Sequence, residues 1–263
     1  MAFTFSINLS SLNGSNGFRL DGEAGGNYSG RSVSAAGDVN GDGFDDLIIG
    51  ANRTASSYVV FGKASSFSAA MDLSSLDGSN DFRLDGAADG SVSTAGDVNG
   101  DGFDDLIVGA PGADPNDTAS GASYVVFGKA SGFSATMDLS ILDGSNGFRL
   151  NGEAFGDHSG FSVSTAEDVN GDGFDDLIVG AYYADSNGVN SGSSYVVFGK
   201  ASGFSPTMDL STLNGSNGFR LDGEAALDHS GSSVSTAGDV NSDGFDDLRP
   251  LQNSTNYQIR YTF

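Results

Sequence analysis

Oxygen-bearing side chains recur at a fixed spacing in four nine-residue segments of this sequence. The first segment reads Asp-Val-Asn-Gly-Asp-Gly-Phe-Asp-Asp over residues 38–46, and the others begin at Asp97, Asp168 and Asp239. Asp or Asn stands at positions 1, 3, 5 and 9, with Gly at position 6. A hard cation such as calcium takes about six to eight oxygen ligands at about 2.3–2.6 Å. A loop this short can supply them only by wrapping tightly round the ion, with Gly at the bend.

We therefore predict four calcium sites per chain, each using the side chains at positions 1, 3, 5 and 9 and the backbone carbonyl of the Phe at position 7. Asp, Asn and Gly are also ordinary turn residues. Turns need no repeated carboxylate cluster, however, and like charges this close repel one another unless a counterion is present. The predicted ligands are Asp38, Asn40, Asp42, Phe44, Asp46, Asp97, Asn99, Asp101, Phe103, Asp105, Asp168, Asn170, Asp172, Phe174, Asp176, Asp239, Asn241, Asp243, Phe245 and Asp247.

The segments beside these loops indicate β-hairpins. Ser32–Ala36 precedes the first loop, and the apolar run Leu47–Ala51 follows it and suits a buried strand. An EF-hand differs, because its loop spans about 12 residues, ends in a bidentate Glu and lies between two helices. Each loop is therefore predicted to connect two strands.

The loops mark internal repeats, with starts spaced by 59, 71 and 71 residues. In the third repeat the predicted strands are Gly147–Gly152, Phe161–Ala166, Asp176–Ala181 and Ser194–Gly199. Four short strands per repeat with short connections are typical of a propeller blade. We expect an all-β propeller with very little helix, in a single domain over 1–263. Its repeats are expected at roughly 23–85, 86–151, 152–222, and 223–263 together with 1–22.

These residues carry a resemblance to a known family. The sequence resembles the FG-GAP repeat of integrin α chains and of many bacterial surface and secreted proteins. The resemblance is carried by Phe161-Ser162-Val163-Ser164, the nine-residue loop, Ile107–Pro111 and Tyr124–Gly128. The resemblance covers almost the whole chain. It implies a β-propeller whose blades bind Ca²⁺ in the hairpin loop between their first two strands.

The match has local departures. Pro111 completes the Gly-Ala-Pro of the family in the second repeat alone, Glu167 replaces the Gly that precedes the other loops, and Ser242 replaces Gly at position 4 of the fourth loop. Position 4 is not a predicted side-chain ligand. All four calcium sites are therefore expected to persist.

Composition excludes several classes of partner. The formal charge is −24, and the loops hold sixteen of the 35 acidic residues. Such a surface argues against binding nucleic acid or anionic membranes. No apolar run is long enough for a membrane span, and residues 1–9 lack the pattern of a classical signal peptide. The chain contains no cysteine, so disulfides give no indication of compartment.

Catalysis is not expected. His158 and His229 each stand in Asp-His-Ser-Gly, which suits a polar connector in two equivalent repeats better than a metal ligand or a general base. The leading interpretation is a noncatalytic, extracellular or cell-surface calcium-binding module for adhesion or protein interaction. The alternatives are the noncatalytic propeller part of a secreted hydrolase and a lectin-like glycan binder.

The two ends of the chain suggest how the ring closes. The fourth repeat departs from the pattern at Arg249-Pro250, and residues 257–263 then alternate between apolar and polar side chains. Residues 3–9 alternate likewise, and Gly17–Leu20 resembles an outer strand without a blade of its own. We expect the N-terminal segment to complete the fourth blade, which gives a four-bladed monomer. The alternative is an open arc of a larger propeller, which pairs with a second chain.

Overall fold

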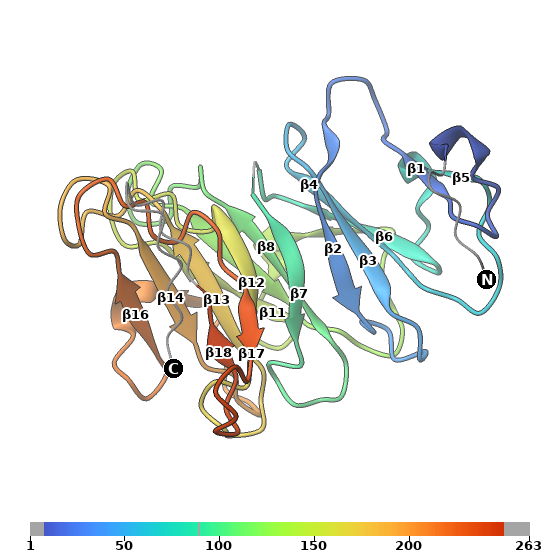
Figure 1. Ribbon diagram of the computed structural model, residues 1–263. Helices are drawn as coiled ribbons and strands as arrows, with labels where there is room; N and C mark the ends of the chain where they lie inside the picture. Colours follow the sequence, from blue (N-terminus) through green and yellow to red (C-terminus); the bar gives the residue numbers. More distant parts are fainter. Residues whose placement is uncertain (1–7, 89, 250–263) are drawn as a thin grey trace.

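A computed structural model describes residues 8–88 and 90–249 of the chain. Antiparallel sheets stand side by side in a curved row, with the first strand of each sheet next to that of its neighbour (Figure 1). Each of the first three blades contains four consecutive antiparallel strands. The strands are β2 (Ser29–Gly37), β3 (Asp46–Ala51), β4 (Ser56–Val60) and β6 (Asp81–Asp85) in blade 1, β7 (Val92–Gly96), β8 (Asp105–Ala110), β9 (Ala122–Val126) and β11 (Gly147–Asn151) in blade 2, and β12 (Ser162–Glu167), β13 (Asp176–Ala181), β14 (Ser193–Val197) and β16 (Gly218–Asp222) in blade 3.

A fourth blade is represented by β17 (Thr236–Gly238) and β18 (Asp247–Leu248), which pair with each other. The repeated FG-GAP-like pattern and the all-β architecture predicted from the sequence are thus confirmed. The helical segments of the described residues are short 3₁₀ turns, as expected: η1 (Leu9–Ser11), η2 (Leu73–Ser75), η3 (Leu139–Ile141) and η4 (Leu210–Thr212). None of the helices in this part of the chain could cross a bilayer.

Three short strands were not predicted from the sequence. They are β5 (Ala70–Asp72), β10 (Thr136–Asp138) and β15 (Thr207–Asp209). β10 pairs in parallel with β6 of blade 1, and β15 pairs in parallel with β11 of blade 2. Blades 1 and 2 thereby each receive a fifth, outermost strand from the repeat that follows. Three residues such as Thr-Met-Asp carry too little periodicity to indicate a strand, so the sequence suggested only a connection here.

The hydrophobic core lies between the blades. Along the second strands of blades 2 and 3, a Leu faces the preceding blade and the next residue, an Ile, faces the following one, because side chains alternate across a strand. Leu106 packs in the cluster between blades 1 and 2, while Ile107 packs in the cluster between blades 2 and 3. Both side chains are fully buried. This burial on both faces explains the continuous apolar run that follows each loop.

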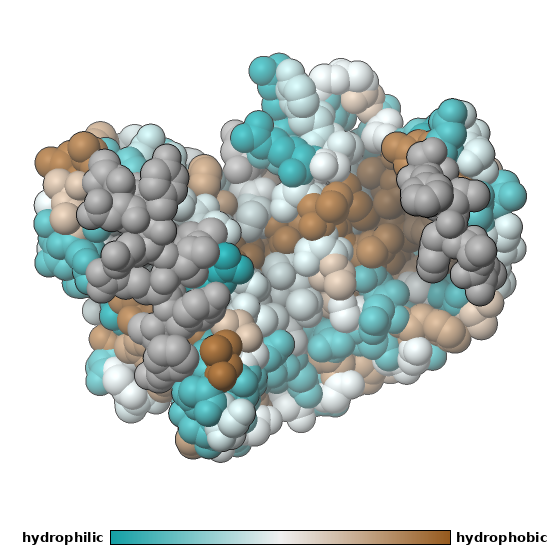
Figure 2. Space-filling view, in the orientation of Figure 1, coloured by the Kyte–Doolittle hydropathy of each residue, from teal (hydrophilic) through white to brown (hydrophobic). Residues whose placement is uncertain are grey.

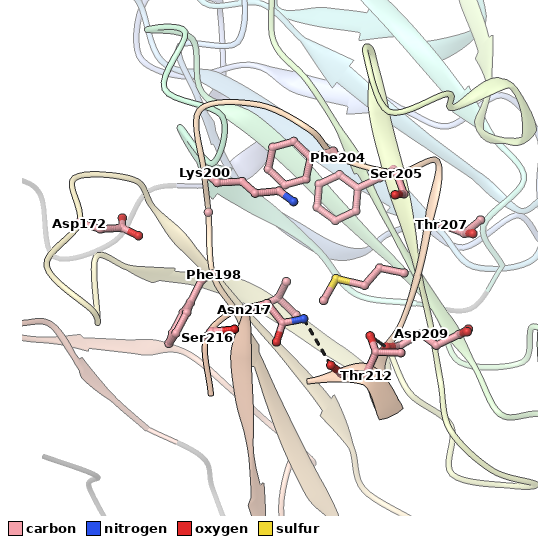
Figure 3. Close-up of a pocket in the computed structure, with 14 residues that line it drawn as sticks. Asp172, Phe198, Lys200, Phe204, Ser205, Thr207, Asp209, Thr212, Ser216 and Asn217 are labelled. Atoms are coloured by element: carbon pink, nitrogen blue, oxygen red, sulfur yellow. Dashed lines mark hydrogen bonds between the residues drawn. The ribbon is translucent and has the colours of Figure 1, made fainter. Parts of the chain in front are cut away.

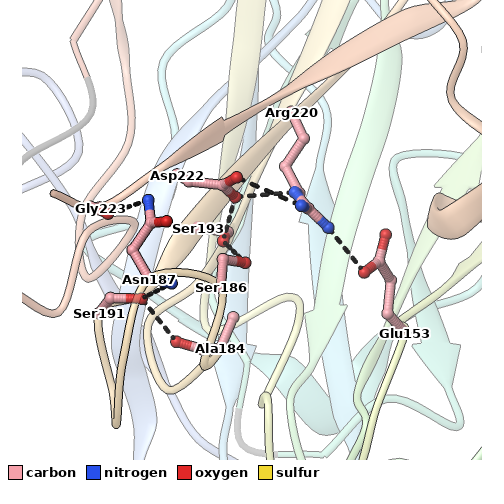
Figure 4. Close-up of polar contacts among 9 residues, drawn as sticks. All are labelled: Glu153, Ala184, Ser186, Asn187, Ser191, Ser193, Arg220, Asp222 and Gly223. Atoms are coloured by element: carbon pink, nitrogen blue, oxygen red, sulfur yellow. Dashed lines mark hydrogen bonds and ion pairs between the residues drawn. The ribbon is translucent and has the colours of Figure 1, made fainter. Parts of the chain in front are cut away.

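Polar contacts fasten the outer strands to neighbouring repeats (Figure 4). Arg220 on β16 pairs with Asp222 at 2.7 Å on its own strand and with Glu153 at 3.0 Å from the connector before blade 3. Arg83 on β6 makes the equivalent pairs with Asp85 and Glu23. The Arg of each Gly-Phe-Arg-Leu segment therefore has a structural role where these pairs form.

The described residues form an open arc, as in the alternative interpretation. β1 (Arg19–Asp21) was expected in the fourth blade, but it pairs with β5 at the opposite end of the row from β17 and β18 (Figure 1). The sequence could not reveal this, because β1 has the same Phe-Arg-Leu pattern as the other outer strands. Residues 3–7 and 257–263, on which the predicted closure also depends, lie outside the described residues.

Candidate metal-binding loops

The four predicted loops connect the first and second strands of their blades, as expected, and lie along the lower edge of the arc in Figure 1. The strand before each loop shifts register near its last residue, between Ala35 and Gly37 in blade 1 and between Thr94 and Gly96 in blade 2. Such an irregularity turns the chain out of the sheet. The loops therefore stand at the sheet edge, next to one another.

Within each loop the acidic side chains accept bonds from the backbone. In the first loop, Asp38 accepts from the N–H groups of Asp42 and Gly43 at 3.0 and 2.8 Å, and Asp42 accepts from Phe44 at 3.0 Å. Asn40 Oδ1 accepts from the N–H of Asp42 at 2.9 Å. In the other three loops the Asp at position 1 also accepts from the N–H groups of positions 5 and 6; these residues are Asp97, Asp168 and Asp239. These bonds hold positions 1, 3 and 5 on the inner side of a tightly curved chain.

The Asp at position 9 anchors each loop to the sheet. Asp105 has no exposed surface and accepts from Val98 N at 3.1 Å and from Gly128 N at 2.9 Å. Asp46 and Asp176 make the equivalent pairs of bonds. Asp247 accepts from Val240 N at 2.8 Å. Position 9 therefore connects the loop to the second strand and, in the first three blades, to the end of the third strand.

Burial makes these anchors costly when they are ionised. It raises the pKa of Asp105 to about 8, and that of Asp46 and Asp176 to about 7, against the opposing effect of the backbone N–H bonds. The carboxylates at positions 1 and 5 raise these pKa values further by like-charge repulsion. A buried carboxylate beside two others is the electrostatic setting that a divalent cation stabilises.

The donor types of the loops thus fit calcium, whereas their arrangement is not that of a closed coordination shell. In residues 8–88 and 90–249, no three Asp, Glu or His side chains converge closely enough to enclose an ion. The carboxylates are occupied by backbone N–H groups instead. The ion pairs of the described residues all use acidic side chains outside the loops. No Lys or Arg of this part of the chain therefore forms an ion pair with a loop carboxylate.

The Asp at position 8 has a role that the sequence did not indicate. Asp104 Oδ2 accepts from the N–H of Asp38 in the preceding loop at 2.7 Å, and Asp175 Oδ2 accepts from Asp97 N at 2.8 Å. Each of the first two loop junctions therefore contains a direct carboxylate–backbone bond. The sequence did contain a signal for this role, because Asp recurs at position 8 in all four loops although this position is not a predicted calcium ligand.

Gly at position 4 serves the same junctions. A Cβ on Gly41 would lie 2.4 Å from the ring of Phe103, and one on Gly100 would lie 2.4 Å from the ring of Phe174. The ring of the Phe at position 7 therefore packs directly against the Gly at position 4 of the preceding loop. Both glycines also have φ near +70°, which disfavours any side chain. The Phe residues were predicted as carbonyl ligands, and their rings have this separate packing role.

The third junction departs from the first two. Glu167 occupies the place of Gly37 and Gly96, with φ of 57°, in the left-handed region. Burial, followed by repulsion from Asp246, raises the pKa of Glu167. Here two carboxyl groups face each other where the other junctions form a carboxylate–backbone bond. The third junction keeps the backbone bond from Asp246 N to Asp168 O, at 3.5 Å against 3.3 Å at the other two junctions.

The two histidines occupy equivalent connectors, as expected. His158 Nδ1 lies 3.0 Å from the carbonyl oxygen of Pro111, and His229 Nδ1 lies 3.3 Å from that of Tyr182. Both residues have left-handed backbones, with φ of 53° and 51°, as does Tyr28 in the first repeat. Their rings pack against Tyr182 and Tyr183. This arrangement supports a structural role in the connectors.

A cavity of about 510 Å³ lies beside the end of β14 (Figure 3). Lys200 lies 4.9 Å from the centroid of the Phe204 ring and donates to Gly203 O at 3.1 Å. Lys63 with Phe67 and Lys129 with Phe133 form equivalent cation–π contacts in the other repeats. Because the arrangement recurs in three repeats, it is a packing feature of the connectors.

Comparison with known proteins gives a consistent result. A family model described as FG-GAP repeat matches residues 29–60, 90–126 and 159–197. Integrin alpha-5 of Xenopus laevis is 30% identical over 201 residues, covering 73% of this chain and 18% of the relative. Integrin alpha-V of Gallus gallus is 31% identical over 188 residues, covering 68% and 17%. The chain therefore spans less than a fifth of the length of these relatives.

Proposed function

This chain is a member of the FG-GAP repeat family, and from that membership we propose that it is a noncatalytic interaction module that binds calcium through four hairpin loops. Its similarity to integrin alpha chains supports adhesion or protein binding over catalysis. The proposed partner is a protein ligand. A glycan array, run with and without calcium, distinguishes this proposal from a lectin-like function.

The observation that carries the calcium proposal is the uncompensated charge of the loops. Each loop holds four aspartates, and burial raises the pKa of the position-9 carboxyl in the first three loops. No basic side chain of the described residues pairs with them. When bound, calcium would supply positive charge there, held by positions 1, 3, 5 and 9 and by the position-7 carbonyl. The chain's own contribution is to place these oxygens in one short loop whose curve is held by backbone N–H bonds.

The expected consequence is stability that depends on calcium. Extracellular modules bind calcium with dissociation constants of about 10⁻⁴–10⁻³ M. At a tenfold excess over such a constant, each site would add about 1.4 kcal/mol to the free energy of unfolding. Four sites would add about 5–6 kcal/mol, comparable with the whole stability of a small domain. Sites this weak suit an extracellular setting, and fractionation that finds the native protein only in the cytoplasm would contradict that location.

Calorimetry with native mass determination tests the proposal. We expect four calcium ions per wild-type chain and three for Asp101→Asn, which alters position 5 of the second loop. Asp138→Asn is the matched control, because it removes the same charge from an exposed acid outside the loops and Asn can still cap η3. It should leave four ions bound. Absence of binding at millimolar calcium would overturn the metal proposal and leave the family assignment intact.

A further inference from the structure

The first blade exposes a face that every later blade buries. Val92 and Val163 on the first strands of blades 2 and 3 are each 5% exposed, whereas the equivalent Val33 is 64% exposed. On the second strands, Leu106 is fully buried but the equivalent Leu47 is 38% exposed. The surface therefore has the composition of an inter-blade core with one side missing.

This face lines a hollow of about 470 Å³ between blade 1 and β1, where hydrophobic residues gather (Figure 2). β1 pairs in parallel with β5, just as β6 pairs with β10 and β11 with β15. It is thus the fourth strand of a blade that precedes blade 1. In blades 1 and 2 the inner edge of this strand carries an antiparallel third strand, β4 or β9. Among the described residues β1 has no such partner, so the hollow corresponds to three missing strands.

The other end of the arc offers the complementary pieces. β17 and β18 are the first two strands of blade 4. Val240, which has no following blade among the described residues, is 50% exposed, although the equivalent Val39 is fully buried. Third strands begin 9 residues after Leu47 in blade 1 and 16 residues after the equivalent Leu106 in blade 2. The alternating sequence Tyr257–Phe263 begins 9 residues after Leu248, within this range.

We propose that the C-terminal end of one copy docks against the N-terminal face of a second copy, so that the blade begun by β17 and β18 is completed by β1 and β5 of its partner copy. A second copy is favoured over the same chain because the two ends lie at opposite sides of the arc (Figure 1). The new contact continues the two inter-blade interfaces already present. Like any head-to-tail contact, it produces closed rings or open chains.

The loops at the two ends also match. Asp45 in the first loop occupies the position at which Asp104 and Asp175 accept a backbone N–H from the preceding loop. Phe44 occupies the position of Phe103 and Phe174, whose rings lie against Gly41 and Gly100 of the preceding loops. In the assembly these two residues would face the loop that begins at Asp239 in the copy whose C-terminal end docks.

Two residues at the C-terminal end make this contact weaker than an internal one. Ser242 stands where Gly41 and Gly100 receive a Phe ring, so its Cβ would meet the ring of Phe44. Arg249 stands where Ile48 and Ile107 pack forward into the next blade, because Leu248 is equivalent to Leu47 in the strand register. The association is therefore reversible, and it should tighten about tenfold or more, a difference of about 1.4 kcal/mol, when Ser242→Gly and Arg249→Ile are combined.

Sedimentation velocity over a concentration series, in saturating calcium, tests the proposal with three matched variants. Val33→Arg alters the N-terminal face, and Ala237→Arg alters the forward side of β17. Val189→Arg is the control, because Val189 is 63% exposed on the loop between β13 and β14, which are strands of neither end. We expect wild type and Val189→Arg to associate as concentration rises, and each end variant to stay monomeric. Melting curves of the end variants in dilute solution should match wild type.

Mixing the two end variants gives the decisive result. Ala237→Arg retains an intact N-terminal face and Val33→Arg retains an intact C-terminal end, so the mixture should form dimers that stop at two copies. A wild type that stays monomeric at every concentration would overturn the proposal and would indicate that another segment or partner covers the face. Loss of association in Val33→Arg alone, with no rescue on mixing, would also overturn it, because that pattern indicates two N-terminal faces packed together.

Discussion

The junction between blades 2 and 3 and the junction between blades 3 and 4 are built from the same repeat but differ at one residue. In the former, Gly96 lets the chain turn with φ of 71°, and Asp97 N donates to Asp175. In the latter, Glu167 holds a similar left-handed backbone, and its carboxyl group faces Asp246. At this junction a contact between two carboxyl groups thus stands where the other junction has a carboxylate that accepts a backbone N–H. The comparison shows that junction strength is set by close backbone approach as well as by the hydrophobic core.

The largest effect is expected from pH in the metal-free protein, where the inner loops bury their position-9 carboxyls. The pKa of Asp105 is raised to about 8 and those of Asp46 and Asp176 to about 7, well above the unfolded value of about 3.9. The folded state therefore binds more protons than the unfolded state between about pH 4 and 8, so stability falls as pH rises through that window. The raised pKa of Glu167 at the third junction acts in the same direction.

Melting curves of metal-stripped protein from pH 5 to pH 8 measure this effect. We expect the melting temperature to fall with rising pH and calcium to remove most of the fall. Asp105→Asn should flatten the metal-free profile, because it deletes one of the titrating groups while keeping an acceptor oxygen. A metal-free melting temperature that rises steadily from pH 5 to pH 8 would show that the buried carboxyls do not control stability.

Removal of the Asp at position 9 should lower the free energy of unfolding more in the second loop than in the fourth. Asp105→Ala leaves the N–H groups of Val98 and Gly128 without their acceptor in a fully buried place. We expect a loss of about 3 kcal/mol in the free energy of unfolding, because each unsatisfied buried donor costs about 1–3 kcal/mol. Asp247→Ala removes the acceptor of the Val240 N–H, and should cost about 1 kcal/mol. Chemical denaturation in calcium-free buffer measures both, and equal losses would contradict the difference between the loops.

Exchanging the junction residues tests the comparison directly. Gly96→Glu should cost about 2 kcal/mol, because a side chain at positive φ is strained and a Cβ there would lie 2.3 Å from the carboxylate of Asp175. Glu167→Gly should stabilise the protein by about 1 kcal/mol, since it removes the strain and the repulsion from Asp246. Urea unfolding measures both changes. Stabilisation by Gly96→Glu would show that the second junction does not depend on glycine.

The smallest effect concerns the Phe rings at position 7. Phe103→Ala removes a ring that packs on Gly41 and should cost about 1 kcal/mol. Phe44→Ala removes an equivalent ring with no preceding loop beneath it, and should cost less than about 0.5 kcal/mol for a dilute monomer. Calcium stoichiometry should stay unchanged in both variants, because the predicted ligand is the backbone carbonyl. Equal costs would indicate that the first ring is also covered.

Much of this molecule could be predicted from its sequence. Leu47-Ile48-Ile49 and its equivalents indicate strands that are buried on both faces, because the run is continuously apolar. The spacing of Asp, Asn and Gly places each loop in a hairpin and limits its chemistry to oxygen donors. Both inferences depend on residue type and local period, which are properties of a few neighbouring residues. The calcium ligands themselves stay a prediction.

Other features were decided only by the tertiary structure. Asp104 bonds to Asp38 across 66 residues of sequence, and β15 joins the edge of a blade formed by an earlier repeat. Val33 and Val92 have nearly the same local sequence, yet one is exposed and the other buried, because burial depends on whether a neighbouring blade is present. Sequence determined what each repeat is able to contact. Position in the arc decided which contacts are made, since each blade buries its faces only against another blade.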